Sequence, residues 1–285
     1  MSESIEAELR TLRPPEESPD DAPRDPAPTS SKPRRRGSRR HRTWLEGGTS
    51  VQFWGWELLG WAVLGLGAGL VAAAALNEFA PQPLGSTLSL LVVWVAFLAP
   101  VVFAFARSRP RALLRFRPLD LLYGIALGLI LRLVQGWLEM AAGGSSAWPA
   151  YSSGGALPSN WWFDQLLAGV IVAPVLEELF FRGLVLVAVY TAVRRLAGAG
   201  IATFAAALVS TGLFVVAHAL LAPVTWDAAV SLALVGLINS LIVLLTGRIW
   251  GAVLAHAVYN GIWIALATVG TLLGGTSPGG TPTLG

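Results

Sequence analysis

The sequence predicts an all-α fold, a polytopic bundle of transmembrane helices. Of the 285 residues, 54% are hydrophobic and only 13% are charged, whereas about 25% of the residues in soluble domains are charged. Several apolar stretches exceed the roughly 20 residues that a helix needs to cross a bilayer. These stretches are continuous and do not alternate with period two, which argues against barrel strands and leaves helices.

Residues 1–45 differ from the rest of the chain because they are rich in proline and begin acidic before turning basic. Such a composition cannot support a packed core, so we expect a disordered cytoplasmic tail. Its arginine-rich part is expected to bind anionic lipid and not nucleic acid. The segment 271–285 is rich in Gly, Thr, Ser and Pro and is expected to be flexible.

The transmembrane domain is expected at 46–270, with about seven spans and eight as the alternative. Lys and Arg concentrate in the N-terminal tail and after the second, fourth and sixth spans, and none lies in the other loops. Because cytoplasmic flanks collect basic residues, the N-terminus is predicted inside and the C-terminus outside. The expected spans are about 53–76, 84–106, 119–141, 161–190, 199–221, 228–247 and 249–270.

Glycines at a spacing of four residues recur in two of the expected spans. Gly65 and Gly69 lie in the first span, and Gly124 and Gly128 lie in the third. Small residues at this spacing let two membrane helices approach closely. Such pairs allow close helix contacts at these two places, although in a chain with 31 glycines they also arise by chance.

Ionisable and amide side chains inside the spans mark the candidate site, because each costs several kcal/mol unless it finds partners or water. The candidates lie in three of the last four spans. Asn239 in the sixth span is expected to form a hydrogen bond between helices, and Arg132 and Glu139 in the third span have no assigned role. The candidates are Glu177, Glu178 and Arg182 in the fourth span, His218 in the fifth, and His256 and Asn260 in the seventh.

The spacing of the carboxylates divides them into two roles. Glu178 and Arg182 are four residues apart, so they share a helix face and can form an ion pair. Glu177 is rotated by about 100° and faces a different neighbour. Pro174 removes a backbone hydrogen bond just before them, which predicts a bend that can line a cavity.

The two histidines pose a problem of depth. His218 falls late in an outward-going span, whereas His256 falls early in another outward-going span. They are therefore expected to meet only if the fifth span starts near residue 204, or if one helix is broken or displaced. His256 and Asn260, four residues apart, are expected to face one partner.

The elements Glu177-Glu178-x-x-x-Arg182, Phe214-x-x-x-His218 and His256-x-x-x-Asn260 occur in this order on membrane helices. Together they resemble the CPBP family of intramembrane proteases, which includes the type II CAAX prenyl endopeptidases, over about 160–270. The resemblance implies peptide-bond hydrolysis in a cavity that opens to the membrane. It also implies that Glu177 is the general base, that His218 positions the water, that His256 and Asn260 stabilise the oxyanion, and that Glu178 and Arg182 support them.

Two mechanisms fit these residues. The chain has no cysteine, so a thiolate nucleophile is excluded, and a carboxylate can activate water without a cofactor. Alternatively, Glu177, His218 and His256 could bind zinc, since two imidazoles and a carboxylate make a hydrolytic metal site. No His-Glu-x-x-His motif is present, and we favour the metal-free mechanism.

Other functions fit the same buried residues. A proton-coupled transporter could use them as a relay, although no inverted repeat is found. A non-catalytic scaffold or immunity protein is the other alternative. The expected substrate is a membrane-embedded or lipidated protein or peptide, whose identity the sequence does not give. The abundance of Arg, Pro, Ala, Gly and Trp is typical of a GC-rich bacterium, which suggests a bacterial plasma membrane and argues against prenylated substrates.

Overall fold

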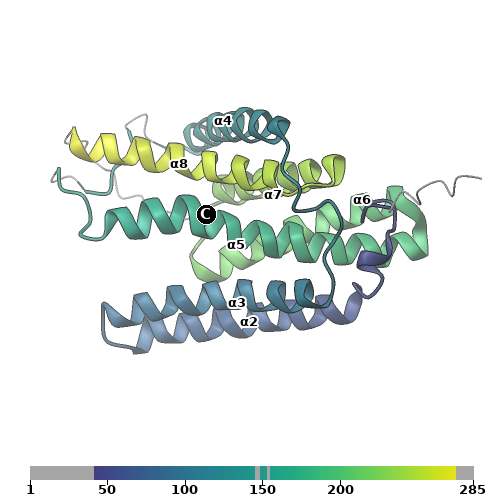
Figure 1. Ribbon diagram of the computed structural model, residues 1–285. Coiled ribbons are helices and arrows are strands. Elements are labelled where there is room, and N and C mark those ends of the chain that lie inside the picture. The colour runs from purple at the N-terminus through teal and green to yellow at the C-terminus, as the bar shows by residue number, and fades with distance from the viewer. Residues whose placement is uncertain (1–41, 145–147, 153–154, 274–285) are drawn as a thin grey trace, which may run out of the picture. The chain divides into compact units, whose positions relative to one another are not determined.

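The computed structural model describes residues 42–144, 148–152 and 155–273. Within these residues the predicted all-helical fold is confirmed, and six helical stretches are long and apolar enough to cross a membrane (Figure 1). The chain is therefore an integral membrane protein. The predictions for the two tails fall on 1–41 and 274–285, outside the described residues, apart from their inner ends.

Most helices agree closely with the expected spans, and their ends differ by no more than about three residues. The fourth expected span is the exception, because its helix continues well beyond residue 190. The described elements are η1 (Thr49–Val51), α2 (Trp56–Phe79), α3 (Leu84–Arg107), α4 (Pro118–Ala141), η2 (Trp162–Val172), α5 (Ala173–Glu178), η3 (Leu179–Val185), α6 (Leu186–Leu221), α7 (Trp226–Thr246) and α8 (Trp250–Leu272).

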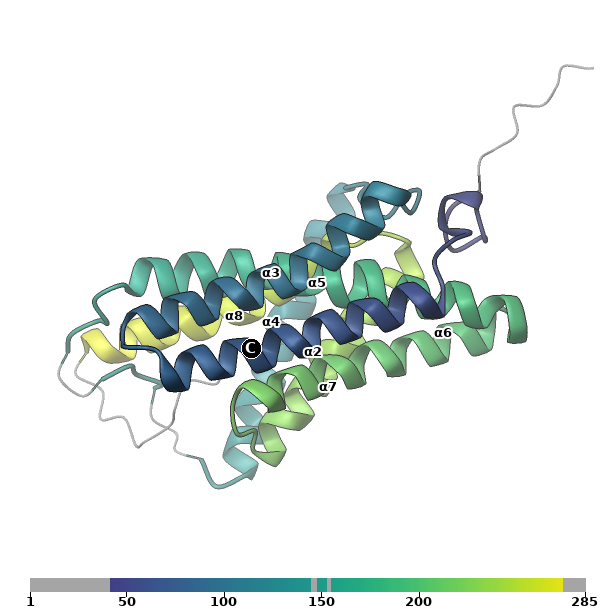
Figure 2. The ribbon, with the colours of Figure 1, turned by 90° about the horizontal axis from the view of Figure 1, so that it is seen from below.

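The stretch Trp162–Leu221 contains two of the expected spans. It spans 60 residues, but Gly198 within α6 has φ 81° and ψ 176°, a left-handed conformation that glycine adopts without strain. The chain reverses there (Figures 1 and 2). The hydroxyl of Ser210 donates to the carbonyl of Phe181 (3.0 Å), so the two arms of this hairpin pack together. Counting them separately gives the predicted seven spans.

Two helix pairs flank the long central helix. Helices α2 and α3 lie side by side, and α4 packs along α8 (Figure 1). At Gly124 an added Cβ would lie 2.3 Å from the Cβ of Leu254, and at Gly128 it would lie 2.7 Å from the carbonyl oxygen of Ala255. The close contact predicted for these glycines is therefore confirmed between α4 and α8.

The turn between α7 and α8 is buried inside the bundle. Arg248, expected on a cytoplasmic flank, is only 7% exposed, and its Nη2 lies 2.7 Å from Oδ1 of the fully buried Asp120. Trp44 also contacts this turn, since its Nε1 donates to the carbonyl of Gly247 (3.0 Å). This turn is thus a packed part of the core.

The buried turn explains how the two histidines meet. His218 follows the reversal at Gly198 by about 20 residues, or about 30 Å of helix, whereas His256 follows Arg248 by about 8 residues, or about 12 Å. Because these helices run roughly parallel (Figure 1), the α7–α8 turn lies deeper than the reversal. The histidines therefore meet because α8 is displaced, starting deeper in the bundle than the second arm of α6. The fifth span does not need to start near residue 204.

Candidate active site

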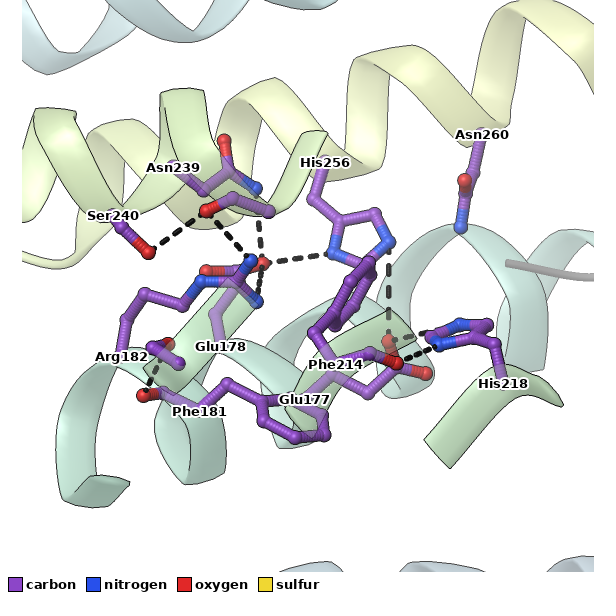
Figure 3. A network of polar contacts seen from close by, with 12 residues as sticks. Glu177, Glu178, Phe181, Arg182, Phe214, His218, Asn239, Ser240, His256 and Asn260 are labelled. Carbon is purple, nitrogen blue, oxygen red and sulfur yellow. Dashed lines mark hydrogen bonds and ion pairs between the residues drawn. The ribbon is translucent and has the colours of Figure 1, made fainter. Parts of the chain in front are cut away.

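The three sequence elements come together in one buried cluster (Figure 3). Helix α5 ends with both carboxylates, η3 adds the arginine, and α6, α7 and α8 surround them with imidazole and amide groups. The cluster comprises Glu177, Glu178, Arg182, His218, Asn239, His256 and Asn260. The sequence-predicted residues therefore lie together, and Asn239 joins them.

Glu178 is the hydrogen-bonding centre of this cluster. The carboxylate is fully buried, and its Oε1 accepts from Arg182 Nη1 (3.0 Å), Asn239 Nδ2 (2.9 Å) and His256 Nδ1 (3.0 Å). Arg182 also donates through Nη2 to the carbonyl of Gly236 (3.1 Å). The predicted Glu178–Arg182 pair is confirmed, and it fixes α7 and α8 against η3.

Glu177 faces away from that centre toward both histidines, as the helix rotation predicts. Its Oε2 lies 3.8 Å from His218 Nε2 and 4.0 Å from His256 Nε2. The side chain is buried, and Oε2 has no hydrogen-bond partner among the described residues. Both separations exceed a hydrogen bond of about 2.7–3.2 Å, so one water beside this oxygen can reach the carboxylate and both rings.

The partners of each ring set the position of its proton. His218 Nδ1 lies 2.8 Å from the carbonyl of Phe214, which can only accept, so Nδ1 carries the proton and Nε2 of the neutral ring has the lone pair. His256 Nδ1 faces the Glu178 carboxylate, which also only accepts when ionised. His256 Nε2 therefore bears a proton only in the imidazolium, whose charge Glu178 would compensate.

Phe214 closes one side of the cluster. Its ring is fully buried, lies 4.4 Å from the His218 ring, and meets the His256 ring edge-on at 5.8 Å between centroids. The Arg182 guanidinium carbon lies 4.6 Å from the same ring centroid. The aromatic ring thus packs both imidazoles and the cation, as expected for a residue one turn before His218.

Asn260 has a different partner from the one expected, because its Nδ2 donates to the carbonyl of Gly169 (2.9 Å). Helix η2 is π-helical, and the amide of Ala173 donates five residues back to Ala168. In that pattern Gly169 would accept from residue 174, which is proline and has no N–H. Pro174 therefore leaves a carbonyl that Asn260 satisfies, and His256 and Asn260 do not share one partner.

A small pocket of about 50 Å³ adjoins the cluster at His218 and Asn260. Helices α4, α7 and α8 supply most of its wall. The sequence alone does not identify most of the polar residues of this pocket, because a single polar residue within a span forms no recognisable motif. Its polar lining consists of Arg132, Gln135, His218, Ser231, Tyr259 and Asn260.

The donor types suit a metal, but their spacing does not. Ligand atoms that share a tetrahedral zinc at about 2.0–2.1 Å lie about 3.3 Å apart, whereas Glu177 Oε2 is 3.8 and 4.0 Å from the two Nε2 atoms. Among the residues that the structure describes, no group of three or more His, Cys, Asp or Glu is arranged to hold a metal ion. Zinc binding would therefore require these side chains to move together.

Comparison with known proteins adds independent information on this segment. Residues 159–262 match the family model described as type II CAAX prenyl endopeptidase Rce1-like. This part of the chain belongs to the Rce1-like family. The Rce1-like segment contains all six predicted site residues, whereas α2, α3 and α4 lie outside it. No match is found among curated proteins or among solved structures.

Proposed function

We propose that this chain is an intramembrane endopeptidase that hydrolyses a peptide bond of a membrane-associated, lipidated protein with water activated by Glu177. The observation that carries the proposal is the buried Oε2 of Glu177. It has no hydrogen-bond partner among the residues that the structure describes, and Nε2 of His218 and of His256 face it. The Rce1-like segment supports a prenylated substrate in particular. This reverses the expectation drawn from composition, which is weaker evidence than the family.

In the proposed reaction Glu177 is the general base. A water bound to Oε2 and to the lone pair of His218 Nε2 attacks the carbonyl carbon of the scissile bond as its proton moves to Glu177. The tetrahedral intermediate collapses, the C–N bond breaks, and the proton on Glu177 passes to the leaving amine. His218 touches the water and fixes its direction of attack.

The developing oxyanion needs donors on the opposite side of the carbonyl. The imidazolium of His256 can donate from Nε2, and Asn260 has a second N–H beside the one that Gly169 accepts. One such donor typically contributes about 3 kcal/mol to catalysis. Asn260 is also one of the residues that line the pocket, where a substrate carbonyl would lie.

Glu178 and Arg182 are assigned a positioning role. Both are fully buried and bind each other, so neither side chain reaches the water site. With both carboxylates ionised and both Arg182 and His256 charged, the cluster is neutral, which a low-dielectric site strongly favours. We propose that Glu178 thereby supports the charged form of His256 when the oxyanion develops.

The proposed mechanism is metal-free, and zinc is the alternative that the same donors allow. We further propose that the N-terminus lies in the cytoplasm of a bacterium and the C-terminus outside. The concentration of basic residues on one side of the spans supports this orientation. The proposed role of the basic tail is binding of anionic lipid.

The test is cleavage of a synthetic S-farnesyl-cysteine peptide by purified protein in detergent, with fragments detected by mass spectrometry. Wild-type protein and Glu57→Gln, which changes an exposed carboxylate on α2, should cleave it. Glu177→Gln should remain folded and inactive. Folded wild-type protein that cleaves neither this peptide nor lipidated peptides, yet moves protons in vesicles, would instead support a transporter.

A further inference from the structure

A second pocket lies at the end of the bundle where α6 reverses at Gly198. Its volume is about 550 Å³, within the range of about 300–1,000 Å³ that is typical of small-molecule sites. The segment 42–55, which contains η1, forms one wall, and the part of α6 around the reversal forms the other (Figure 1). None of its described lining residues lines the pocket beside His218, so this arginine pocket, named for Arg194 and Arg195, is separate from the candidate active site.

Two arginines make the arginine pocket positive. Arg194 and Arg195 both line it, and no Asp or Glu is among its described lining residues. Glu46, which lies within the segment 42–55, is exposed and does not line the pocket, and its Oε2 accepts from the amide of Thr43 (2.8 Å). A guanidinium presents a planar set of donors that matches a phosphate or a carboxylate. The charge of the pocket therefore favours an anionic ligand.

The two arginines have different surroundings. Arg195 donates from Nη2 to two carbonyls of the first wall, those of Val51 (3.4 Å) and Gln52, so it fixes that wall to α6. Arg194 lies against Gly47, where an added Cβ would be 1.9 Å from its Nη1. Gly47 has φ 75°, which glycine adopts without strain. Among the described residues the guanidinium of Arg194 has no hydrogen bond or ion pair, so its donors are free to bind a ligand.

A buried hydroxyl in the same pocket is the second observation that points to a ligand. Thr191 also lines the pocket and lies one turn before the arginines on α6, so the three side chains share one side of the helix. The residue is only 6% exposed, and its Oγ1 has no hydrogen-bond partner in the described structure. An unpaired buried hydroxyl is unfavourable, and a ligand oxygen that accepts from Oγ1 would remove this cost.

The position of the pocket favours a phosphate carried by a lipid. The pocket lies at one end of the membrane-crossing helices, where lipid headgroups are found, and basic pockets between such helices are known headgroup sites. Exposed apolar residues lie next to its polar lining. Leu196 follows Arg195 and is 79% exposed, and Phe53 follows Gln52 and is 77% exposed. Acyl chains can contact such residues while the headgroup binds in the pocket.

We propose that the arginine pocket binds a phosphate group, with Arg194 and Thr191 as donors and Arg195 holding the wall in place. An anionic phospholipid and a soluble phosphate share this chemistry, and the position of the pocket favours the lipid. The site is distinct from the attraction of the basic tail to anionic lipid, because it requires residues of α6. It is also independent of the proposed peptidase function, since binding is measured without cleavage.

The experiment titrates the purified full-length protein in detergent with phosphatidylglycerol, or with a diacylglycerol that has the same acyl chains but no phosphate. Native mass spectrometry counts the bound molecules. Wild-type protein should bind one phosphatidylglycerol at least about tenfold more tightly than diacylglycerol, the factor expected for a charge-assisted hydrogen bond. Arg194→Gln should abolish this preference, and Arg194→Lys should retain part of it. Arg115→Gln, which removes an exposed arginine between α3 and α4, should retain all of it.

Thr191→Val separates ligand binding from a structural role of the hydroxyl. It should weaken the binding of phosphatidylglycerol by a factor of about three or more. It should not lower the unfolding temperature of lipid-free protein, because the hydroxyl that it removes has no partner in the described structure. Unchanged lipid binding together with a lower unfolding temperature would overturn the role of Thr191 as a donor.

Inorganic phosphate distinguishes the two sources. If the ligand is a lipid, millimolar phosphate should not displace phosphatidylglycerol. Phosphate that binds alone, depends on Arg194 and displaces the lipid would support the phosphate site and assign it to a soluble compound. Equal binding of phosphatidylglycerol and diacylglycerol to wild-type protein, or a preference that survives Arg194→Gln and is lost at high salt, would overturn the proposal, because screening by salt marks diffuse surface attraction.

Discussion

The Nδ1 atom of His256 and the Oε1 atom of Glu178 lie 3.0 Å apart, both fully or almost fully buried. This contact joins an imidazole that faces Glu177 to the ion pair that holds α5, η3 and α7 together. The chemistry proposed at Glu177 and the stability of the bundle therefore depend on adjacent residues. Substitutions of Glu177 should affect catalysis, whereas substitutions of Glu178 should affect the stability of the bundle.

Glu178→Gln should destabilise the protein, while Glu177→Gln should not. The first change leaves Arg182 as an uncompensated buried charge, which typically costs about 3–5 kcal/mol. Within the described part of the chain Glu177 Oε2 has no hydrogen-bond partner, so its replacement should alter stability by less than about 1 kcal/mol. Thermal unfolding in detergent, followed by tryptophan fluorescence, measures both. Equal loss of stability in the two variants would contradict the assigned roles.

His218→Ala should reduce kcat by about 10²-fold, because the attacking water loses the group that orients it. Its Nδ1 bonds only to the carbonyl one turn earlier on its own helix, so the cost in stability should be about 1 kcal/mol. Steady-state cleavage and thermal unfolding on the same preparation check both values. Full activity in a folded His218→Ala protein would exclude His218 from the water site.

Pro174 and Asn260 should be coupled through Gly169. Asn260→Ala in the wild-type background leaves the carbonyl of Gly169 without its donor, at a cost of about 1–3 kcal/mol. In a Pro174→Ala background the new backbone N–H can bond to that carbonyl, so the same substitution should cost less. A double-mutant cycle on thermal stability measures the coupling. Additive effects would show that the proline and the amide act independently.

Gly124→Leu should disrupt the bundle, whereas Gly136→Leu on the same helix should be tolerated. An added Cβ at Gly124 would meet Leu254 at 2.3 Å, but at Gly136 no atom lies within 4 Å. Overpacking typically costs about 1–3 kcal/mol, and separation of α4 from α8 would add to this. Unfolding temperatures of the two variants, and of Gly124→Ala, provide the comparison.

Composition and spacing were sufficient for much of this architecture because lipid imposes strong constraints on a sequence. The helices and the Glu178–Arg182 pair follow from hydropathy and from the period of the helix. The expected spans end at 190 and begin again at 199. The reversal at Gly198 therefore lies at the end of the predicted loop between them. The helix continues beyond residue 190 to that glycine, so its length exceeds what a bilayer requires.

Other features of the site depend on tertiary contacts that no local pattern encodes. Arg248 was expected at the membrane surface, but its partner Asp120 is 128 residues away in the sequence. Asn260 donates to the backbone carbonyl of Gly169. In the sequence, only Pro174, five residues later, indicates that this carbonyl lacks its helical donor. The polar residues that α4 and α7 contribute to the pocket are Arg132, Gln135 and Ser231. Each is isolated in its span and resembles an ordinary contact between helices.

The most direct test of the central claim is turnover of a farnesylated peptide by wild-type and Glu177→Gln protein, with zinc content measured in the same samples. Wild-type protein should cleave the peptide while it contains far less than one zinc per chain. Glu177→Gln should reduce kcat by a factor of at least about 10², with unchanged thermal unfolding. Activity that rises and falls with stoichiometric zinc, or cleavage that persists in folded Glu177→Gln protein, would contradict it.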